Sequence, residues 1–183
     1  MTAMISLLRG VNVGGHHMIR MEALRALYES IGLKGAKTYV QSGNVVFRTS
    51  EQNPEKLALR IEKAIEKEFG FRPSVILRTL EEMREVIGRN PYAGRKDIEG
   101  SKLLVTFLAG DPEPRARDQL FEIKTDPEEM HLIGRELYIY FPNGMGRSKL
   151  PFKPIEKALK TPGTARNWNS VIKLAELAAS FER

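Results

Sequence analysis

The chain has 183 residues, 42% of them hydrophobic and 28% charged, so it is long enough to bury a core and too apolar to be disordered. It contains no cysteine, which excludes disulfides and thiolate chemistry and favours a cytoplasmic location. No leader is evident and no apolar run approaches the roughly 20 residues of a membrane span, so we expect no membrane partner.

The first 79 residues are predicted to hold four strands and two helices in the order β-α-β-β-α-β. Apolar runs predict strands at 4–9, 37–41, 45–48 and 74–78. Helical periodicity predicts one helix at 21–31 and a second that starts after the pair Asn53-Pro54 and ends at Gly70. This order of elements is that of a ferredoxin-like unit.

The second half repeats this pattern with one expected difference. Thr79-Leu80-Glu81-Glu82 is a capping box that opens a connecting helix, and a polar linker then runs to Ser101. Further elements are predicted as a strand at 103–108, a helix from 111, a hairpin at 130–133 and 137–141, and a helix at 152–159. The final strand is expected to be missing, with a helix in its place that starts at Ala165 and is capped by Thr164.

We therefore predict an α+β protein made of duplicated ferredoxin-like units, the second of them modified with a C-terminal helix. The predicted domains are 1–79, a connecting helix and linker at 80–101, and 102–183.

Four polar loops that contain or follow glycine separate the apolar segments, at 8–17, 41–44, 144–149 and 164–169. In a ferredoxin-like sheet the first and third strands are antiparallel neighbours, so Arg9 and Asn12 are expected at the same edge as Ser42 and Asn44. The first helix there has no good capping residue, and its free N–H groups beside Gly14-Gly15 are suited to an anion. The alternative is that these polar groups hold the loops together by hydrogen bonds to backbone.

Basic residues are concentrated near the C-terminus. Between Gly144 and Lys173 there are seven bases and one acid, so this segment carries the whole formal net charge of +6. Arg147, Ser148 and Lys149 are candidate donors to a phosphate. The alternatives are a turn before a helix and a solvated helix face.

Recognisable catalytic motifs are lacking. Neither glycine-rich segment, 10–17 or 144–149, has the Walker or dinucleotide spacing, and Ser42 and Ser148 have no identifiable base. His16 and His17 are adjacent in a glycine-rich loop, point in different directions and have no cysteine or carboxylate nearby in sequence, so we expect no metal site with His131 and no cofactor.

Two aromatic features have competing interpretations. Trp168 falls on the apolar face of the last helix, where a core role is favoured over base stacking. A sheet face that displays Tyr138 and Tyr140 is a weaker candidate for RNA recognition by stacking.

The loops also carry a family resemblance over nearly the full length. The motifs are Leu8-Arg9-Gly10-Val11-Asn12-Val13-Gly14-Gly15, the segment 38–47, Asn90-Pro91, Gly146-Arg147-Ser148-Lys149-Leu150 and the segment 164–169. In this order they resemble the family called domain of unknown function 1697. The resemblance implies a bacterial-type cytosolic protein built from a duplicated ferredoxin-like unit, and it implies no reaction.

Three functions remain open from the sequence. The first is binding of a phosphate-bearing ligand, either a nucleotide, a phosphorylated metabolite or a nucleic acid. The second is an enzyme that positions a small polar substrate with hydrogen-bond donors, and the third is a structural or assembly protein. The candidate binding residues are Arg9, Asn12, Gly14, Gly15, Gln41, Ser42, Asn44, Arg147, Ser148, Lys149, Arg166 and Asn167.

Overall fold

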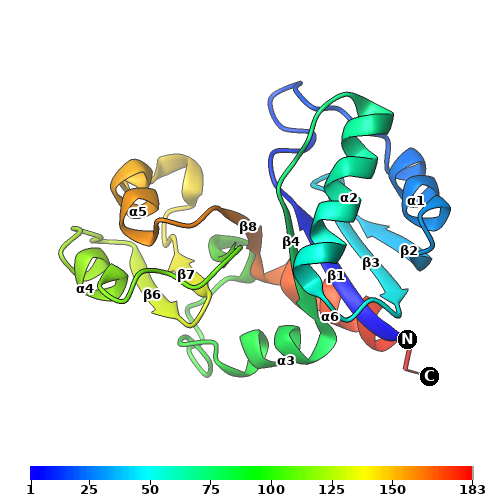
Figure 1. Cartoon of the computed structure of the whole chain (residues 1–183). Coiled ribbons are helices and arrows are strands. Elements are labelled where there is room, and N and C mark those ends of the chain that lie inside the picture. The colour runs from blue at the N-terminus through cyan, green and yellow to red at the C-terminus, as the bar shows by residue number, and fades with distance from the viewer. Residues whose placement is uncertain (183) are drawn as a thin grey trace. The chain divides into compact units, whose positions relative to one another are not determined.

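The computed structural model describes residues 1–182, and these form two compact units (Figure 1). One unit comprises residues 1–85 together with the C-terminal segment from Ile172, and the other comprises Val86–Val171. Each contains a four-stranded antiparallel sheet, and the described residues include six α-helices, so the protein is of the mixed α/β type. None of the helices in the described chain is both long and apolar enough to span a membrane.

The first sheet has the strand order β2-β3-β1-β4. Its elements are β1 (Thr2–Leu8), α1 (Met21–Ser30), β2 (Lys34–Tyr39), β3 (Asn44–Thr49), α2 (Pro54–Phe69) and β4 (Val75–Thr79), followed by α3 (Leu80–Gly88). In the register of the sheet, Leu7 lies opposite Asn44 and Ile5 opposite Arg78. The predicted pairing of the first and third strands is therefore confirmed.

The core of this unit lies between the sheet and the helices α1 and α2. Strand β1 directs Met4 and Leu8 to this face by its two-residue period, and both are buried with apolar residues of β3, β4, α1 and α2. Ser6, on the same face, forms a buried hydrogen bond of 2.7 Å with the hydroxyl of Tyr28. Asn53 accepts a hydrogen bond from Lys56 N and caps α2, as the sequence predicts.

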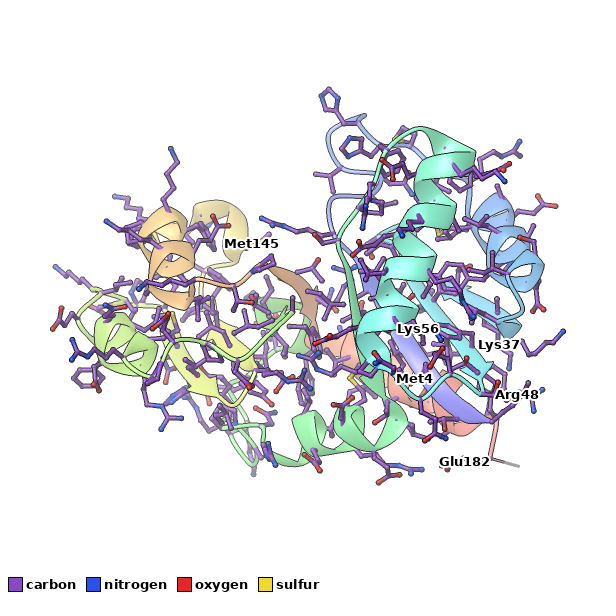
Figure 2. The ribbon with its side chains drawn as sticks, in the orientation of Figure 1. Met4, Lys37, Arg48, Lys56, Met145 and Glu182 are labelled. Atoms are coloured by element: carbon purple, nitrogen blue, oxygen red, sulfur yellow. The ribbon has the colours of Figure 1, made fainter. Side chains whose placement is uncertain are left out.

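The C-terminal segment belongs to the same unit. The centroid of the Phe181 ring lies 4.7 Å from Lys37 Nζ and 5.4 Å from Arg48 Cζ. Lys37 is on the edge strand β2 and Arg48 is on its neighbour β3 (Figure 2). Residues after Ile172 therefore belong to the first unit, although the chain reaches them only after completing the second.

The second sheet has the order β6-β7-β5-β8, which matches the first strand for strand. Its elements are η1 (Gly100–Lys102), β5 (Leu103–Leu108), α4 (Ala116–Phe121), β6 (Glu129–Ile133), β7 (Glu136–Tyr140), η2 (Met145–Arg147), α5 (Phe152–Leu159) and β8 (Gly163–Asn167), followed by α6 (Trp168–Ala179). A core that includes Leu108, Leu137, Ile139 and Ile155 packs between this sheet and the helices α4 and α5.

The prediction that the second copy lacks its final strand is wrong. Residues Gly163–Asn167 form β8, which pairs antiparallel with β5 and places Arg166 opposite Val105. The following helix starts at Trp168 rather than Ala165, and it is capped by Asn167 rather than Thr164, because Ser170 N donates to Asn167 Oδ1 at 2.9 Å.

The face that carries Tyr138 and Tyr140 is not free for base stacking. Both residues are buried, and their hydroxyls donate hydrogen bonds to Val86 O at 2.7 Å and to Asp97 O at 2.8 Å. Burial raises the pKa of the Tyr138 phenol well above its usual value. These tyrosines are structural, and Trp168 is half-buried at the start of α6.

Candidate functional site

The loop of residues 9–20 after β1, called the N-terminal loop below, is held by one side chain. Asn12 Nδ2 donates to Ile19 O at 3.0 Å and to Gln41 O at 2.7 Å, while Asn12 Oδ1 accepts from Ile19 N at 2.7 Å. The residue adopts a left-handed backbone conformation with φ of 55°, which asparagine tolerates better than most residues. Asn12 therefore closes the loop on itself and ties it to the turn between β2 and β3.

That turn, residues 40–43 and called the β2–β3 turn below, packs directly on the end of β1. Leu8 N donates to Gly43 O at 3.0 Å, and a Cβ atom at Gly43 would lie 2.8 Å from Leu8 Cβ. Asn44 is fully buried, and its Nδ2 donates to Tyr39 O at 3.0 Å and to Ser42 Oγ at 2.9 Å. The two segments thus meet as the sheet topology predicts.

The amide groups predicted to face a ligand are used within the protein. An amide NH₂ has two N–H donors, and those of Asn12 and Asn44 all donate to acceptors within the protein. The exposed side chains of Arg9 and Gln41, by contrast, make no hydrogen bond or ion pair with any described residue. The alternative interpretation, in which the asparagines hold the loops together, fits the geometry of Asn12 and Asn44.

Gly14 and Gly15 lie at the exposed end of the N-terminal loop with positive φ values of 58° and 76°. Helix α1 begins after Arg20 without a side-chain cap, as predicted. The ring of His17 stacks on Phe71 with ring centroids 4.3 Å apart, and that of His131 lies edge-on to Tyr92 at 5.4 Å. No group of three potential metal-ligating side chains occurs among residues 1–182.

The second unit carries a row of cations around the start of α5. Arg147 and Lys149 precede the helix, and Lys153 and Lys157 follow one turn apart on it; these four residues are called the α5 basic surface below. Met145, beside Arg147 in η2, marks its position in Figure 2. All four side chains are exposed, and within the described chain none has a hydrogen-bond or ion-pair partner.

Several cations elsewhere in the protein are paired with carboxylates, unlike those of the α5 basic surface. Arg72 pairs with Glu62 at 3.1 Å, Arg95 with Glu129 at 2.7 Å, and Lys102 with Glu99 at 2.8 Å. The only acid between Gly144 and Lys173 is Glu156. Positive potential is therefore largely uncompensated at this surface.

Three other predicted donors have structural partners. Ser148 Oγ accepts from Leu150 N at 3.0 Å, and Asn167 caps α6. Arg166 is 7% exposed and donates from Nη1 to Thr164 Oγ1 at 2.7 Å and to Ala165 O at 2.9 Å. Burial lowers the pKa of Arg166 to about 10.

Comparison with known proteins identifies the family. Residues 1–138 match the family described as protein of unknown function (DUF1697). The chain belongs to the DUF1697 family. No curated protein matches it. Among solved structures, the conserved bacterial protein SP0830 from Streptococcus pneumoniae is similar with a TM-score of 0.76 and 22% sequence identity, over 97% of this chain and 98% of that chain. This similarity shows that the two chains share a fold.

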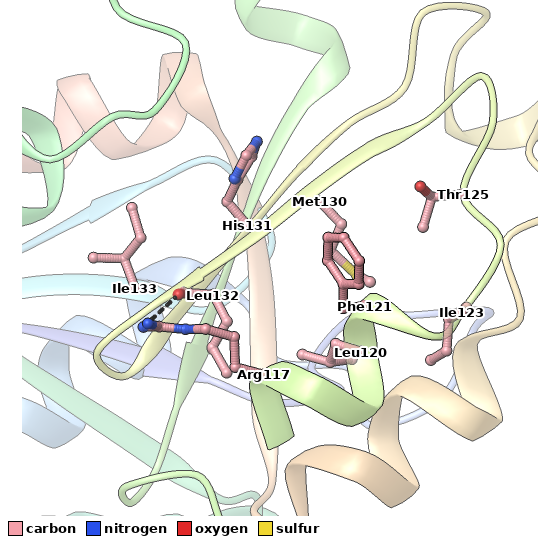
Figure 3. A pocket seen from close by; sticks show the side chains of 9 residues that line it. All are labelled: Arg117, Leu120, Phe121, Ile123, Thr125, Met130, His131, Leu132 and Ile133. Carbon is pink, nitrogen blue, oxygen red and sulfur yellow. Dashed lines mark hydrogen bonds between the residues drawn. The ribbon is translucent and has the colours of Figure 1, made fainter. Parts of the chain in front are cut away.

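This DUF1697 protein also contains a pocket that its sequence does not predict. A cavity of about 600 Å³ lies between α4 and the edge strand β6 (Figure 3). Six of its nine lining residues are apolar, among them Phe121, which is 92% exposed. Arg117 Nη2 donates to Leu132 O at 3.1 Å. Arg117, Thr125 and His131 add polar groups to this lining, so the pocket offers apolar contact with a few polar contacts beside it.

Lys153 and Lys157 are not among the candidate binding residues predicted from the sequence, although both belong to the basic segment between Gly144 and Lys173. Their spacing of four residues on a helix places them on one face, next to each other. This spacing is the signal that could have identified them.

Proposed function

We propose that the protein binds nucleic acid through phosphate contacts at the α5 basic surface. The observation that carries the proposal is the group of four exposed cations, Arg147, Lys149, Lys153 and Lys157, that lack a carboxylate partner in the described chain. Cations held without a partner repel one another, and a polyanion relieves this repulsion while releasing its own counterions.

The two helices α2 and α5 occupy the same place in the order of elements, and their N-termini differ in the way this function requires. Helix α2 has the cap Asn53 and an acidic first-turn residue, Glu55, and the nearby Glu51 pairs with Lys56 at 3.2 Å. Helix α5 has neither a side-chain cap nor an acid in its first turn. The positive end of the α5 dipole is thus left without a negative side chain, which favours an anion from outside.

A polymer fits this surface better than a nucleotide or a phosphorylated metabolite does. A small ligand needs donors that converge on one hollow, and the amides of Asn12 and Asn44 that were candidates for that role are spent on backbone and side-chain acceptors. The α5 basic surface instead spreads its charges over a loop and two turns of helix, as contacts to successive phosphates require.

The test is fluorescence anisotropy with labelled single-stranded and double-stranded oligonucleotides, measured from about 50 to 200 mM salt. The logarithm of the association constant should fall linearly with the logarithm of salt concentration. The double variant Lys153→Gln/Lys157→Gln should reduce the magnitude of this slope by about 1.4 on single strands and about 1.8 on duplex, since each phosphate contact contributes ~0.7 or ~0.9.

The matched control is Lys63→Gln/Lys67→Gln on α2. These lysines have the same spacing of four residues and the same exposure, and their removal changes the net charge equally. An unchanged slope for the control and a reduced slope for the α5 variant supports the proposal. Equal losses in both variants would mean that only net charge matters, and no binding at the lowest salt would remove the proposal altogether.

The two sheets also support a proposal about the architecture of the protein. We propose a duplicated ferredoxin-like architecture in a cytoplasmic protein. It is supported by the same strand order in both sheets and by the matching registers of Ile5 with Arg78 and Val105 with Arg166. The domain boundaries at 1–79, 80–101 and 102–183 remain a prediction.

A further inference from the structure

Three exposed apolar side chains gather around the N-terminal loop and the β2–β3 turn. Val13 is 62% exposed, Met18 64% and Val40 51%. Isolated exposed aliphatic residues are ordinary, but three within two contacting segments form a cluster that water solvates poorly. We call Val13, Met18 and Val40 the apolar tip.

The hydrogen bonds of Asn12 bring the three positions together. Val13 directly follows Asn12, Met18 directly precedes Ile19, and Val40 directly precedes Gln41. Asn12 bonds to both backbone groups of Ile19 and to Gln41 O, at distances between 2.7 and 3.0 Å. The apolar tip is therefore held in a fixed arrangement, which lowers the entropy cost of binding.

The backbone at Val40 adds a second observation. Its φ of 51° lies in the left-handed region, where a β-branched side chain is a genuine outlier. Folding would be favoured by glycine or asparagine at this position and by a polar side chain at this exposure. The strained backbone and the exposed side chain of Val40 both destabilise the fold. A role in binding accounts for a valine at this position, whereas a purely structural turn does not.

The N-terminal loop itself carries cations and no acidic residue. The exposed guanidinium groups of Arg9 and Arg20 make no hydrogen bond or ion pair with the described residues, and no acidic residue precedes Glu22 in the chain. An incoming partner thus meets apolar side chains flanked by two cations, with no carboxylate from this loop to repel an acidic group.

We infer that the apolar tip with Arg9 and Arg20 is a docking surface for an acidic protein segment that carries apolar side chains. Guanidinium groups bind carboxylates through paired N–H donors, so Arg9 and Arg20 would both attract an acidic segment and fix its orientation. A nucleic acid is disfavoured because the three side chains of the tip are not aromatic and the neighbouring ring of His17 is already stacked on Phe71. A membrane surface is disfavoured because the tip has no tryptophan or tyrosine anchor and only two cations.

The inference is tested by following amide signals of ¹⁵N-labelled protein as short synthetic peptides are added up to about 1 mM. One peptide alternates glutamate with leucine, a second replaces leucine with serine, and a third replaces glutamate with lysine. The first should shift the amides of Val13, Met18 and Gln41 with an affinity that falls as salt rises, and the other two should bind at least about tenfold more weakly.

Two variants locate the binding energy. Val13→Ser/Met18→Ser should weaken binding of the first peptide about tenfold or more, while the control Leu59→Ser, at an exposed leucine of α2 in the same unit, should leave it unchanged. Arg9→Gln should weaken binding and reduce its salt dependence, while Lys63→Gln should do neither.

Several results would overturn the inference: no shifts in the N-terminal loop at the highest peptide concentration, equal binding of the serine peptide, or equal losses in the Leu59 control. Sedimentation with vesicles of phosphatidylcholine and phosphatidylserine provides the last check. If the wild type sediments with them and Val13→Ser/Met18→Ser does not, the occupant is a membrane surface and the inference is wrong.

Discussion

Replacing Asn12 by alanine is the sharpest test of how the loops are held. The substitution removes two hydrogen bonds to the backbone of Ile19 and one to Gln41 O. The two bonds to Ile19 are partly buried and contribute about 1 kcal/mol each, and the exposed bond to Gln41 contributes about 0.5 kcal/mol. Alanine in the left-handed conformation adds about 1 kcal/mol, because the φ of 55° is unfavourable for a residue with a Cβ atom.

The expected loss in the free energy of unfolding is therefore about 3.5 kcal/mol for Asn12→Ala. The variant Asn12→Gly removes the same hydrogen bonds without the conformational penalty, so it should lose about 2.5 kcal/mol. Arg9→Ala should change stability by less than about 0.5 kcal/mol, because the Arg9 side chain is exposed and has no partner in the described chain.

The assay must report on the first unit, because the two units need not unfold together. The single tryptophan, Trp168, lies in the second unit, so its fluorescence reports the wrong part of the chain. Hydrogen exchange of the Ile19 amide and of the amides of β1 measures the opening free energy of the first unit, and far-ultraviolet circular dichroism in urea follows the unfolding of the whole chain. A loss under 1 kcal/mol with Ile19 still protected, or an equal loss in Arg9→Ala, would refute this account of the loop.

Three further predictions concern other parts of the fold. Gly163→Ala should destabilise the second unit by about 1–3 kcal/mol in urea unfolding, because its Cβ would lie 2.8 Å from a threonine methyl, whereas the nearest contact at Gly110→Ala is 3.6 Å and that variant should be nearly neutral. Thr79→Ala should cost about 1 kcal/mol, since it removes the cap of α3 in which Glu82 N donates to Thr79 Oγ1 at 3.1 Å; peptide-bond circular dichroism of the urea transition measures it. Burial raises the pKa of the Tyr28 phenol above its value in the unfolded chain, so the folded protein keeps this proton at a pH where the unfolded chain has lost it. The free energy of unfolding should therefore be constant below pH ~10 and fall by up to ~1.4 kcal/mol per pH unit above it. The slope above pH ~10 should be smaller in Tyr28→Phe.

The sequence predicts the helices and strands of the first unit well because local signals agree with the tertiary structure there. The pair Asn53-Pro54 and Gly70 mark the ends of α2, and the capping box at Thr79 marks the start of α3. Strand β8 was missed because its segment has no apolar run: the residues that alternate toward the interior are Thr164 and Arg166. A strand whose buried positions are polar does not show the hydrophobic period on which its prediction depends.

The candidate site was harder to predict for a different reason. The sheet topology correctly brings the N-terminal loop to the β2–β3 turn, but residue type cannot say whether an amide faces a ligand or a neighbouring carbonyl. Asn12 and Asn44 donate to carbonyl and hydroxyl oxygens within the same unit. Lys153 and Lys157 were hard to predict for the opposite reason. They are candidates because they have no ion-pair partner in the described chain, and the sequence alone does not show whether a distant carboxylate pairs with a lysine.

Two buried arginines, Arg78 and Arg166, have structural roles and differ in this from the exposed cations that a ligand can reach. Arg78 in β4 is 1% exposed and Arg166 in β8 is 7% exposed, and both stand at the same register position of their sheets, opposite Ile5 and Val105. Each is followed by the residue that caps the next helix. Burial of a guanidinium carries a desolvation cost that exposed cations do not have, and its repetition at both strand-to-helix junctions ties Arg166 to the framework. The proposed phosphate contacts therefore involve the exposed cations around α5 and not Arg166. The Lys153→Gln/Lys157→Gln variant tests binding without disturbing the sheet, whereas a change at Arg166 would alter the framework.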